Sequence, residues 1–283
     1  MPLRKAYCSQ WYPETLDEIK KYFTNPSLKS KKQFFFALAP HAGWIYSGKI
    51  AGKVYSQISQ ADTVIILGTN HTGLGTPTSL FSEGEWEMPL GPIKIASEFS
   101  LELLQNSKEI KADTEAHLYE HAIEVQIPFL QAISPNAKIV PIEMRDYRLE
   151  VCKEIAWSLA KTLAETIKKN PDQNFCVISS SDMTHCGQNY GQEVPKKISA
   201  SGFAEKQDRM AIEEILQINP ENLLKVVEEQ NITMCGAGPT AVMLETAKLL
   251  GAKNAELLGY ATSSDLTGKK SEFAVGYAGV MIQ

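Results

Sequence analysis

Short apolar runs alternate along the chain with longer segments in which apolar positions recur every three or four residues. The short runs predict strands at residues 34–38, 63–67, 138–142, 175–179, 257–261 and 274–281. The longer segments predict helices at residues 49–58, 115–133, 150–169, 203–216 and 240–250. Several runs are apolar without alternation, as expected when helices cover both faces of a sheet. The pattern therefore predicts an α/β protein, with a single three-layer αβα domain over residues 1–283.

Composition narrows the class of protein further. The 283 residues are 43% hydrophobic, which is enough for a large buried core. The net charge is −5, and the lysines and arginines are scattered apart from residues 29–32, so we expect no nucleic-acid partner. The longest apolar runs, such as residues 64–67, are far below the roughly 20 residues that span a bilayer. We expect a cytoplasmic protein that does not associate with membranes.

Two histidines follow the first two predicted strands. His41 comes directly after the run at 34–38, and His71 follows the run at 63–67 within a glycine-rich segment. In open α/β sheets, functional groups gather in the crevice at the carboxyl ends of the strands. An isolated histidine more often bonds a loop backbone group, but two of them at equivalent strand ends favour a shared site.

The third and fourth candidates lie later in the chain. Asp182 and His185 follow the strand predicted at 175–179, where the acid could fix the tautomer of an imidazole or could be a turn carboxylate. Cys235 stands before a glycine-rich turn and a predicted helix, whose N-terminus favours a thiolate. This cysteine could be a metal ligand, a nucleophile or an inert buried thiol. The five cysteines lack a CxxC pair, which argues against a disulfide framework or a zinc ribbon.

One short motif suggests a different chemistry. His117, Glu120 and His121 match the pattern H-x-x-E-H, in which two histidines one helical turn apart bind zinc and the glutamate acts as a base. A zinc protease is therefore an alternative, although five-residue patterns also occur by chance.

Six segments together resemble the Memo protein family, in order and over nearly the whole chain. They are "APHAGWIYSG", "LGTNHTGLG", "EHAIEVQIPFL", "ISSSDMTHCG", "MCGAGPTAVML" and "SEFAVGYAGVMI". The resemblance implies a fold similar to class III extradiol ring-cleaving dioxygenases, which hold non-haem iron with two histidines and a carboxylate. By resemblance, His41 and His71 are metal ligands, and the third ligand is Cys235.

The donor set implied by the resemblance limits the cofactor. A thiolate is softer than a carboxylate and shifts the preference toward copper(I) or zinc. We expect one mononuclear transition metal, iron or copper with zinc as a third option, and no nucleotide cofactor. The resemblance also implies catalytic roles for His121, Asp182 and His185, and it places Trp11 and Tyr46 as aromatic residues that bind the substrate.

Three hypotheses follow for the function. The first is metal-dependent redox or dioxygenase-like chemistry on an unknown substrate, with His121 or His185 moving a proton. The second is a metal- or peptide-binding module without catalysis, and the third is a hydrolase with Cys235 as its nucleophile. Family relatives are associated with a radical S-adenosylmethionine protein or resemble adaptors that bind phosphotyrosine peptides. The six segments contain no lysine or arginine, so they lack the arginine cluster that phosphopeptides normally require.

Overall fold

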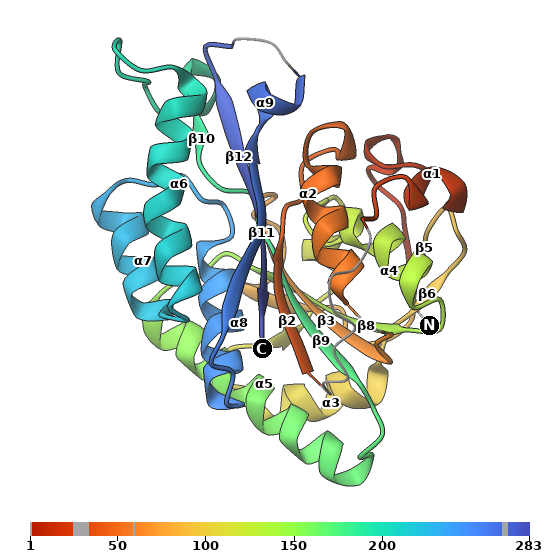
Figure 1. Ribbon diagram of the computed structural model, residues 1–283. Coiled ribbons are helices and arrows are strands. Elements are labelled where there is room, and N and C mark those ends of the chain that lie inside the picture. The colour runs from red at the N-terminus through yellow and green to blue at the C-terminus, as the bar shows by residue number, and fades with distance from the viewer. Residues whose placement is uncertain (1, 25–33, 59, 268–270) are drawn as a thin grey trace.

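Four parallel strands form the centre of the molecule (Figure 1). The computed structural model describes residues 2–24, 34–58, 60–267 and 271–283. The central strands lie in the order β2 (Phe34–Ala39), β9 (Phe175–Ser180), β3 (Thr63–Thr69) and β8 (Lys138–Met144). Because they are parallel, their carboxyl ends meet at one edge of the sheet, where loops can bring distant side chains together.

Further strands extend this sheet on both sides. Within the described residues it has nine strands, and the outer ones are β12 (Ala274–Ile282), β11 (Ala255–Thr262), β10 (His185–Cys186), β4 (Thr78–Leu80) and β7 (Lys111–Ala112). β12 runs antiparallel to β2, β10 and β11, and β4 runs antiparallel to β8. A separate three-stranded sheet contains β1 (Leu3–Lys5), β5 (Glu85–Glu87) and β6 (Ile93–Lys94).

Helices cover both faces of the large sheet. One face is covered by α1 (Leu16–Lys20), α2 (Trp44–Gln57) and α4 (Ile127–Ile133). The other is covered by α3 (Ser97–Asn106), α5 (Leu149–Lys169), α6 (Ala200–Leu216), α7 (Pro220–Glu229) and α8 (Ala237–Leu249). A short helix, α9 (Ser263–Thr267), connects β11 to the segment before β12. Single 3-10 turns occupy Ser9–Trp11, Glu115–His117, Glu124–Gln126 and Gln188–Tyr190.

The central strands separate two hydrophobic cores. In β2, Phe35 and Ala37 pack into the core beneath α2 and α4, whereas Phe36 and Leu38 pack into the core beneath α5 and α8. This alternation follows from the twofold periodicity of a strand, and it explains why both kinds of position are apolar. The predicted α/β fold, with helices on both faces of one sheet, is confirmed.

The helix predicted over residues 115–133 is wrong. The segment contains two 3-10 turns, Glu115–His117 and Glu124–Gln126, before α4 begins at Ile127. Pro128 explains the late start, because proline lacks an amide hydrogen and is tolerated in the first turn of a helix but not in its interior. The residues between the turns are therefore free to form a loop that presents His121.

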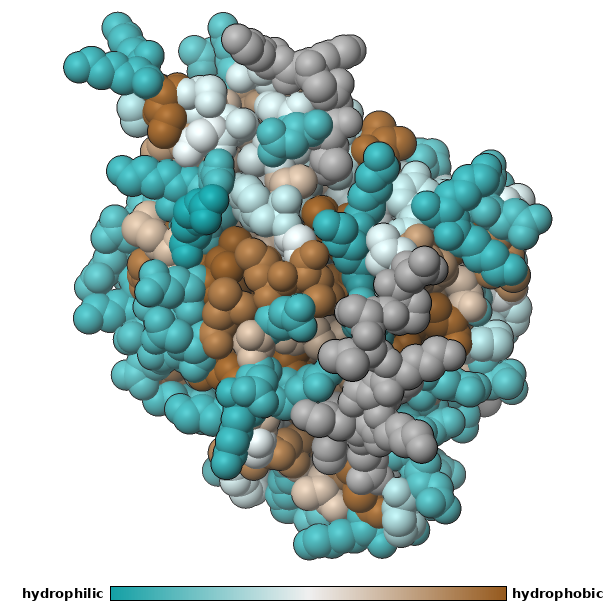
Figure 2. Space-filling view, in the orientation of Figure 1, coloured by the Kyte–Doolittle hydropathy of each residue, from teal (hydrophilic) through white to brown (hydrophobic). Residues whose placement is uncertain are grey.

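The edge strand β11 lies on an apolar part of the surface. Figure 2 shows hydrophobic side chains around it, and Leu257 and Tyr260 form a groove of about 550 Å³ with Ile212 and Leu216 of α6. This groove shares no lining residue with a second, larger cleft, which is lined by His121, Asp182 and His185 among others. Within the described part of the chain, no helix has the length and apolarity needed to cross a membrane.

Candidate metal centre

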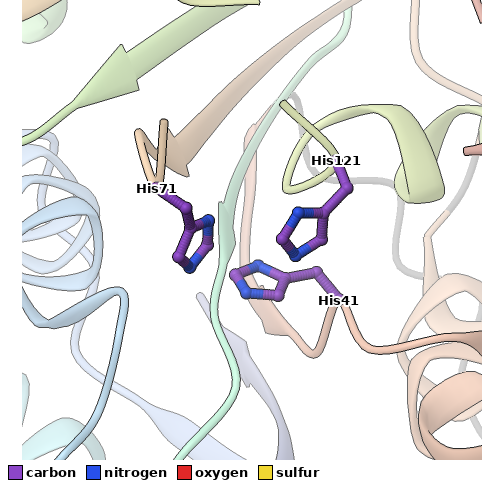
Figure 3. Close-up of side chains that lie close together, drawn as sticks. All are labelled: His41, His71 and His121. Carbon is purple, nitrogen blue, oxygen red and sulfur yellow. The ribbon is translucent and has the colours of Figure 1, made fainter. Parts of the chain in front are cut away.

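Three histidines from three separate loops face one another. His41 follows β2, His71 follows β3, and His121 lies in the loop between two 3-10 turns (Figure 3). One ring nitrogen from each lies within 4.8 Å of the others, so the group could hold a metal ion. The ring centroids are 5.4 Å apart for His41 and His71, and 4.8 Å apart for His71 and His121.

Glu120 orients two of these rings. Its Oε1 lies 3.0 Å from Nδ1 of His71 and 3.1 Å from Nδ1 of His121, and it also accepts the amide hydrogens of His121 and Ala122. Although burial opposes the charged form, hydrogen bonds from His121 and His71 hold the pKa of Glu120 well below its ordinary value of 4.5. A carboxylate only accepts hydrogen bonds, so each Nδ1 carries the proton and each Nε2 is left as a candidate ligand atom.

Ser180 sets the tautomer of the third ring. Its hydroxyl donates to the carbonyl of Ala122 at 2.6 Å, so the 3.2 Å contact with His41 requires Nδ1 of the histidine to donate. Nε2 of His41 is then unprotonated and lies 3.2 Å from Sγ of Cys235. Burial lowers the pKa of His41 well below 6.5, and the neighbouring histidines lower it further. This ring is therefore neutral, as a metal ligand must be.

Cys235 is fixed by its own carbonyl group. Cys235 lies two residues before α8 begins, and its carbonyl oxygen accepts hydrogen bonds from Thr69 at 2.9 Å and from Tyr147 at 3.0 Å. The thiol also interacts with His71. Burial lowers the pKa of His71, but hydrogen bonds to Cys235 and Glu120 outweigh burial and raise it to about 10.

Glycines shape the loop that carries His71. Gly73 and Gly75 adopt φ values of +71° and +68°, which side chains rarely tolerate. A Cβ on Gly75 would also collide with Asp113. The guanidinium of Arg145 donates to the carbonyls of both glycines, so the loop is held from outside as well. These contacts keep His71 close to the other two histidines.

Asp182 and His185 lie beside the three histidines. Asp182 follows β9, and its Oδ1 accepts the amide hydrogens of His41 at 2.8 Å and Ala42 at 3.2 Å. Burial raises the pKa of this carboxyl. Nδ1 of His185 lies 2.9 Å from the carbonyl of Met183, so Nδ1 carries a proton and donates to this oxygen. Both residues line the cleft that opens next to the centre.

The cleft has a volume of about 840 Å³ and is rich in aromatic residues. Trp11 and Tyr46, the two aromatic residues expected from the sequence, both line it. The Trp11 ring lies 4.8 Å from the ring of His121, so the N-terminal segment forms one wall of the cleft beside the centre. Other aromatic residues of the lining are Tyr190, Phe273 and Tyr277.

His117 lies apart from the centre. Its ring packs edge-on against Phe81 and Trp86 in the core, and its Nε2 lies 3.2 Å from the carbonyl of Ser79. Burial, together with the charge of the nearby Arg4, lowers the pKa of His117 to about 3. The zinc-protease alternative is wrong, because its two histidines neither share a helix nor join the same group of possible ligands.

Sequence patterns located the histidines better than the residues that orient them. The sequence indicates Glu120 as the base of the protease pattern and as part of one Memo-like segment, and Ser180 is not among the predicted site residues. The adjacency of Glu120 to His121 could have suggested a role in orienting a histidine. No sequence signal points to Ser180, because its contact with His41 depends on the pairing of β2 with β9.

The fold and the histidine group define an α/β protein with a metal-binding candidate at the carboxyl edge of its parallel strands. Residues 4–281 match the model of the Memo-like protein family. The chain belongs to this family, as its sequence motifs suggested.

Curated archaeal relatives support the same conclusion. A MEMO1 family protein of Saccharolobus islandicus is 43% identical over 253 residues, which cover 88% of this chain and 83% of the relative. A MEMO1 family protein of Sulfurisphaera tokodaii is 41% identical over 259 residues, which cover 90% of this chain and 85% of the relative. The similarity therefore extends over most of both proteins.

Proposed function

We propose that the protein binds one transition-metal ion through His41, His71 and Cys235 and uses it for redox or dioxygenase-like chemistry. The observation that carries this proposal is the contact between Sγ of Cys235 and the unprotonated Nε2 of His41, whose other nitrogen is occupied by Ser180. A thiol beside the neutral imidazole of His41 is a donor set for iron, copper or zinc, and a bound ion would displace the proton that the raised pKa of His71 retains. When bound, such an ion would supply Lewis-acid or one-electron chemistry.

The surrounding residues would handle the proton and the substrate. Glu120 fixes Nδ1 of His121, so Nε2 of this ring is free to take or give a proton at the end of the cleft. His185 offers a second Nε2 in the same cleft, while Asp182 holds the backbone of His41. Trp11 would position a planar substrate against His121.

A Cys235 hydrolase is a second candidate because Sγ lies within reach of a neutral His41. Its main difficulty is that the backbone amide next to the thiol is already engaged and is not free to stabilise a developing oxyanion. The amide of Gly236, the residue after the thiol, already donates to Ser181 at 2.9 Å. The non-catalytic binding module expected as an alternative would keep the metal and lack turnover.

Metal content distinguishes the ligand sets. Protein purified without a histidine tag or added metal is analysed for metal per chain, followed by a screen of oxygen uptake with small aromatic compounds. We expect about one ion per chain, lost in His41→Ala and Cys235→Ser and retained in His121→Ala. Loss in His121→Ala with retention in Cys235→Ser would instead show that the three histidines are the ligands.

His117→Ala is the matched control, since it removes a buried histidine of the same loop region that does not face the centre. Its metal content should equal that of the wild type. Rapid alkylation of Cys235 that bound metal does not slow would favour the hydrolase. A metal-bound protein that never consumes oxygen would favour the binding module.

We propose two further properties. An association with a radical S-adenosylmethionine protein is implied by the resemblance to the family, and a cytoplasmic location is expected from the short apolar runs of the sequence. Co-purification of the full chain with such a protein from its own source would support the first.

A further inference from the structure

Several aromatic side chains besides Trp11 line the cleft. Tyr46, Tyr190 and Phe273 line it and are 38%, 42% and 40% exposed, while Tyr277 is buried behind them. The rings of Tyr190 and Phe273 lie 6.3 Å apart, and Tyr190 also contacts His185 at 5.2 Å. Exposed aromatic residues that converge in a cleft are typical of a binding site.

A buried carboxyl group belongs to the same wall. Asp182 is 3% exposed and lines the cleft with the tyrosines. Its Oδ1 accepts two amide hydrogens, from His41 and Ala42, which are the contacts that a carboxylate prefers. Tyr46, Tyr190 and Tyr277 line this cleft together with Asp182, and, after burial, Asp182 and Tyr46 contribute to the raised pKa of Tyr190 and of Tyr277.

Among the described residues that line the cleft, none is a lysine or an arginine, and the basic side chains there are His121 and His185. Within this described lining, a ligand carboxylate or phosphate would find no lysine or arginine to pair with. A positively charged nitrogen, in contrast, would be attracted both by the carboxylate and by the faces of the tyrosine rings.

We infer that the cleft binds an organic cation, with an ammonium group between Asp182 and the rings of Tyr46, Tyr190 and Tyr277. The remainder of the ligand extends toward Trp11 and the three histidines. For the chemical nature of this second part of the ligand, the inference rests on the proposed function. The substrate class is then a ring-bearing amine and excludes anionic aromatic acids. Phe273 adds apolar contact at the mouth of the cleft.

Three small probes with the same ring test this inference. Phenethylamine is cationic, 2-phenylethanol is neutral and phenylacetate is anionic, and none of them chelates a metal as a catechol does. Binding to the full-length, zinc-loaded protein is measured by calorimetry or by ligand-detected NMR at neutral pH. We expect phenethylamine to bind about tenfold more tightly than the alcohol, as a partly desolvated cation–π contact allows. Phenylacetate should bind most weakly.

Two variants locate the site. Asp182→Asn keeps an oxygen that can accept from His41 and Ala42, so it removes charge with little change in shape. It should remove the preference for the amine and leave the affinity for the alcohol unchanged. Tyr190→Phe should retain the preference because the ring remains, whereas Tyr190→Leu should weaken it several-fold.

The outcomes separate this inference from the metal proposal. Equal affinity for the three probes, or tightest binding of phenylacetate, would overturn the inference while leaving the metal analysis intact. Retained preference in Asp182→Asn with normal zinc content would likewise show that Asp182 is not the recognition group. If Cys235→Ser lost its metal and still preferred the amine, the binding site would stand independently of the metal.

Discussion

Buried carboxyl groups of this protein fall into two kinds. Glu120 and Glu124 accept several hydrogen bonds and are ionised, whereas neither oxygen of Glu143 has a partner among the described residues. Glu143 lies on β8 beside Gly68 of β3, where a Cβ would collide with its carboxyl group. Burial raises the pKa of Glu143 well above 4.5, and the charge of Glu120 raises it further. Glu143 is therefore a neutral acid beneath the centre.

The first prediction follows from this neutral acid. Above pH 4.5 the unfolded side chain loses its proton while the folded one keeps it, so this group makes the wild type less stable as pH rises. Glu143→Gln has nearly the same shape and lacks that penalty. We expect the stability of the variant, relative to wild type, to increase between pH 5 and pH 8 in urea unfolding. An identical difference at both pH values would contradict a raised pKa.

At the residue scale, the sequence indicated the candidate ligands His41 and His71 more clearly than it indicated the residues around them. His41 and His71 could be found because strands end visibly where apolar runs stop, and parallel strands bring such ends together. Their tautomers could not be predicted, since they depend on contacts with Ser180 and Glu120 that are distant in sequence. The unpartnered state of Glu143 likewise depends on the packing of three strands.

At the scale of elements, one ion pair connects the N-terminal segment to the loop of the centre. Nη1 of Arg4 lies 2.7 Å from Oε2 of Glu124, and both side chains are fully buried. Glu124 also accepts the amide hydrogens of Tyr7 and Cys8 and the hydroxyl of Tyr12. This network fixes the segment that carries Trp11 against the loop that carries His121.

The second prediction concerns this connection. Glu124→Gln leaves the guanidinium of Arg4 buried without its counter-charge, which typically costs about 3–5 kcal/mol of stability. We expect a loss of this order in urea unfolding. Glu221→Gln is the control, because its pair with Lys153 is largely exposed and should change stability by less than about 1 kcal/mol. Equal effects of the two substitutions would show that the buried pair is not important for folding.

The strands of the central sheet were predictable, and the segment around His121 was not. Apolar runs without alternation identify strands covered on both faces, and β2, β3, β8 and β9 all contain such a run. The apolar residues near His121 also suggest a helix, but tertiary contacts decide the outcome. The carboxylate of Glu120 accepts backbone hydrogens of His121 and Ala122, which stabilises a turn at that point.

At the scale of the whole molecule, the centre joins four distant parts of the chain but lies outside both hydrophobic cores. His41, His71, His121 and Cys235 are carried by loops or by the residue before a helix turn, while the cores lie on the two faces of the sheet. The C-terminal strand β12 is buried along its whole length and pairs with β2, β10 and β11. We therefore expect the fold to be stable without a bound ion.

The third prediction follows from this separation of core and centre. The protein freed of metal by a chelator should still unfold cooperatively, because its cores do not depend on the ion as a zinc finger does. Zinc at about a thousand times its dissociation constant should then add about 4 kcal/mol to the free energy of unfolding and raise Tm by several degrees. His41→Ala should keep the Tm of the metal-free protein and show no rise with zinc in differential scanning calorimetry. A metal-free wild type without a cooperative transition would instead show that the ion is part of the fold.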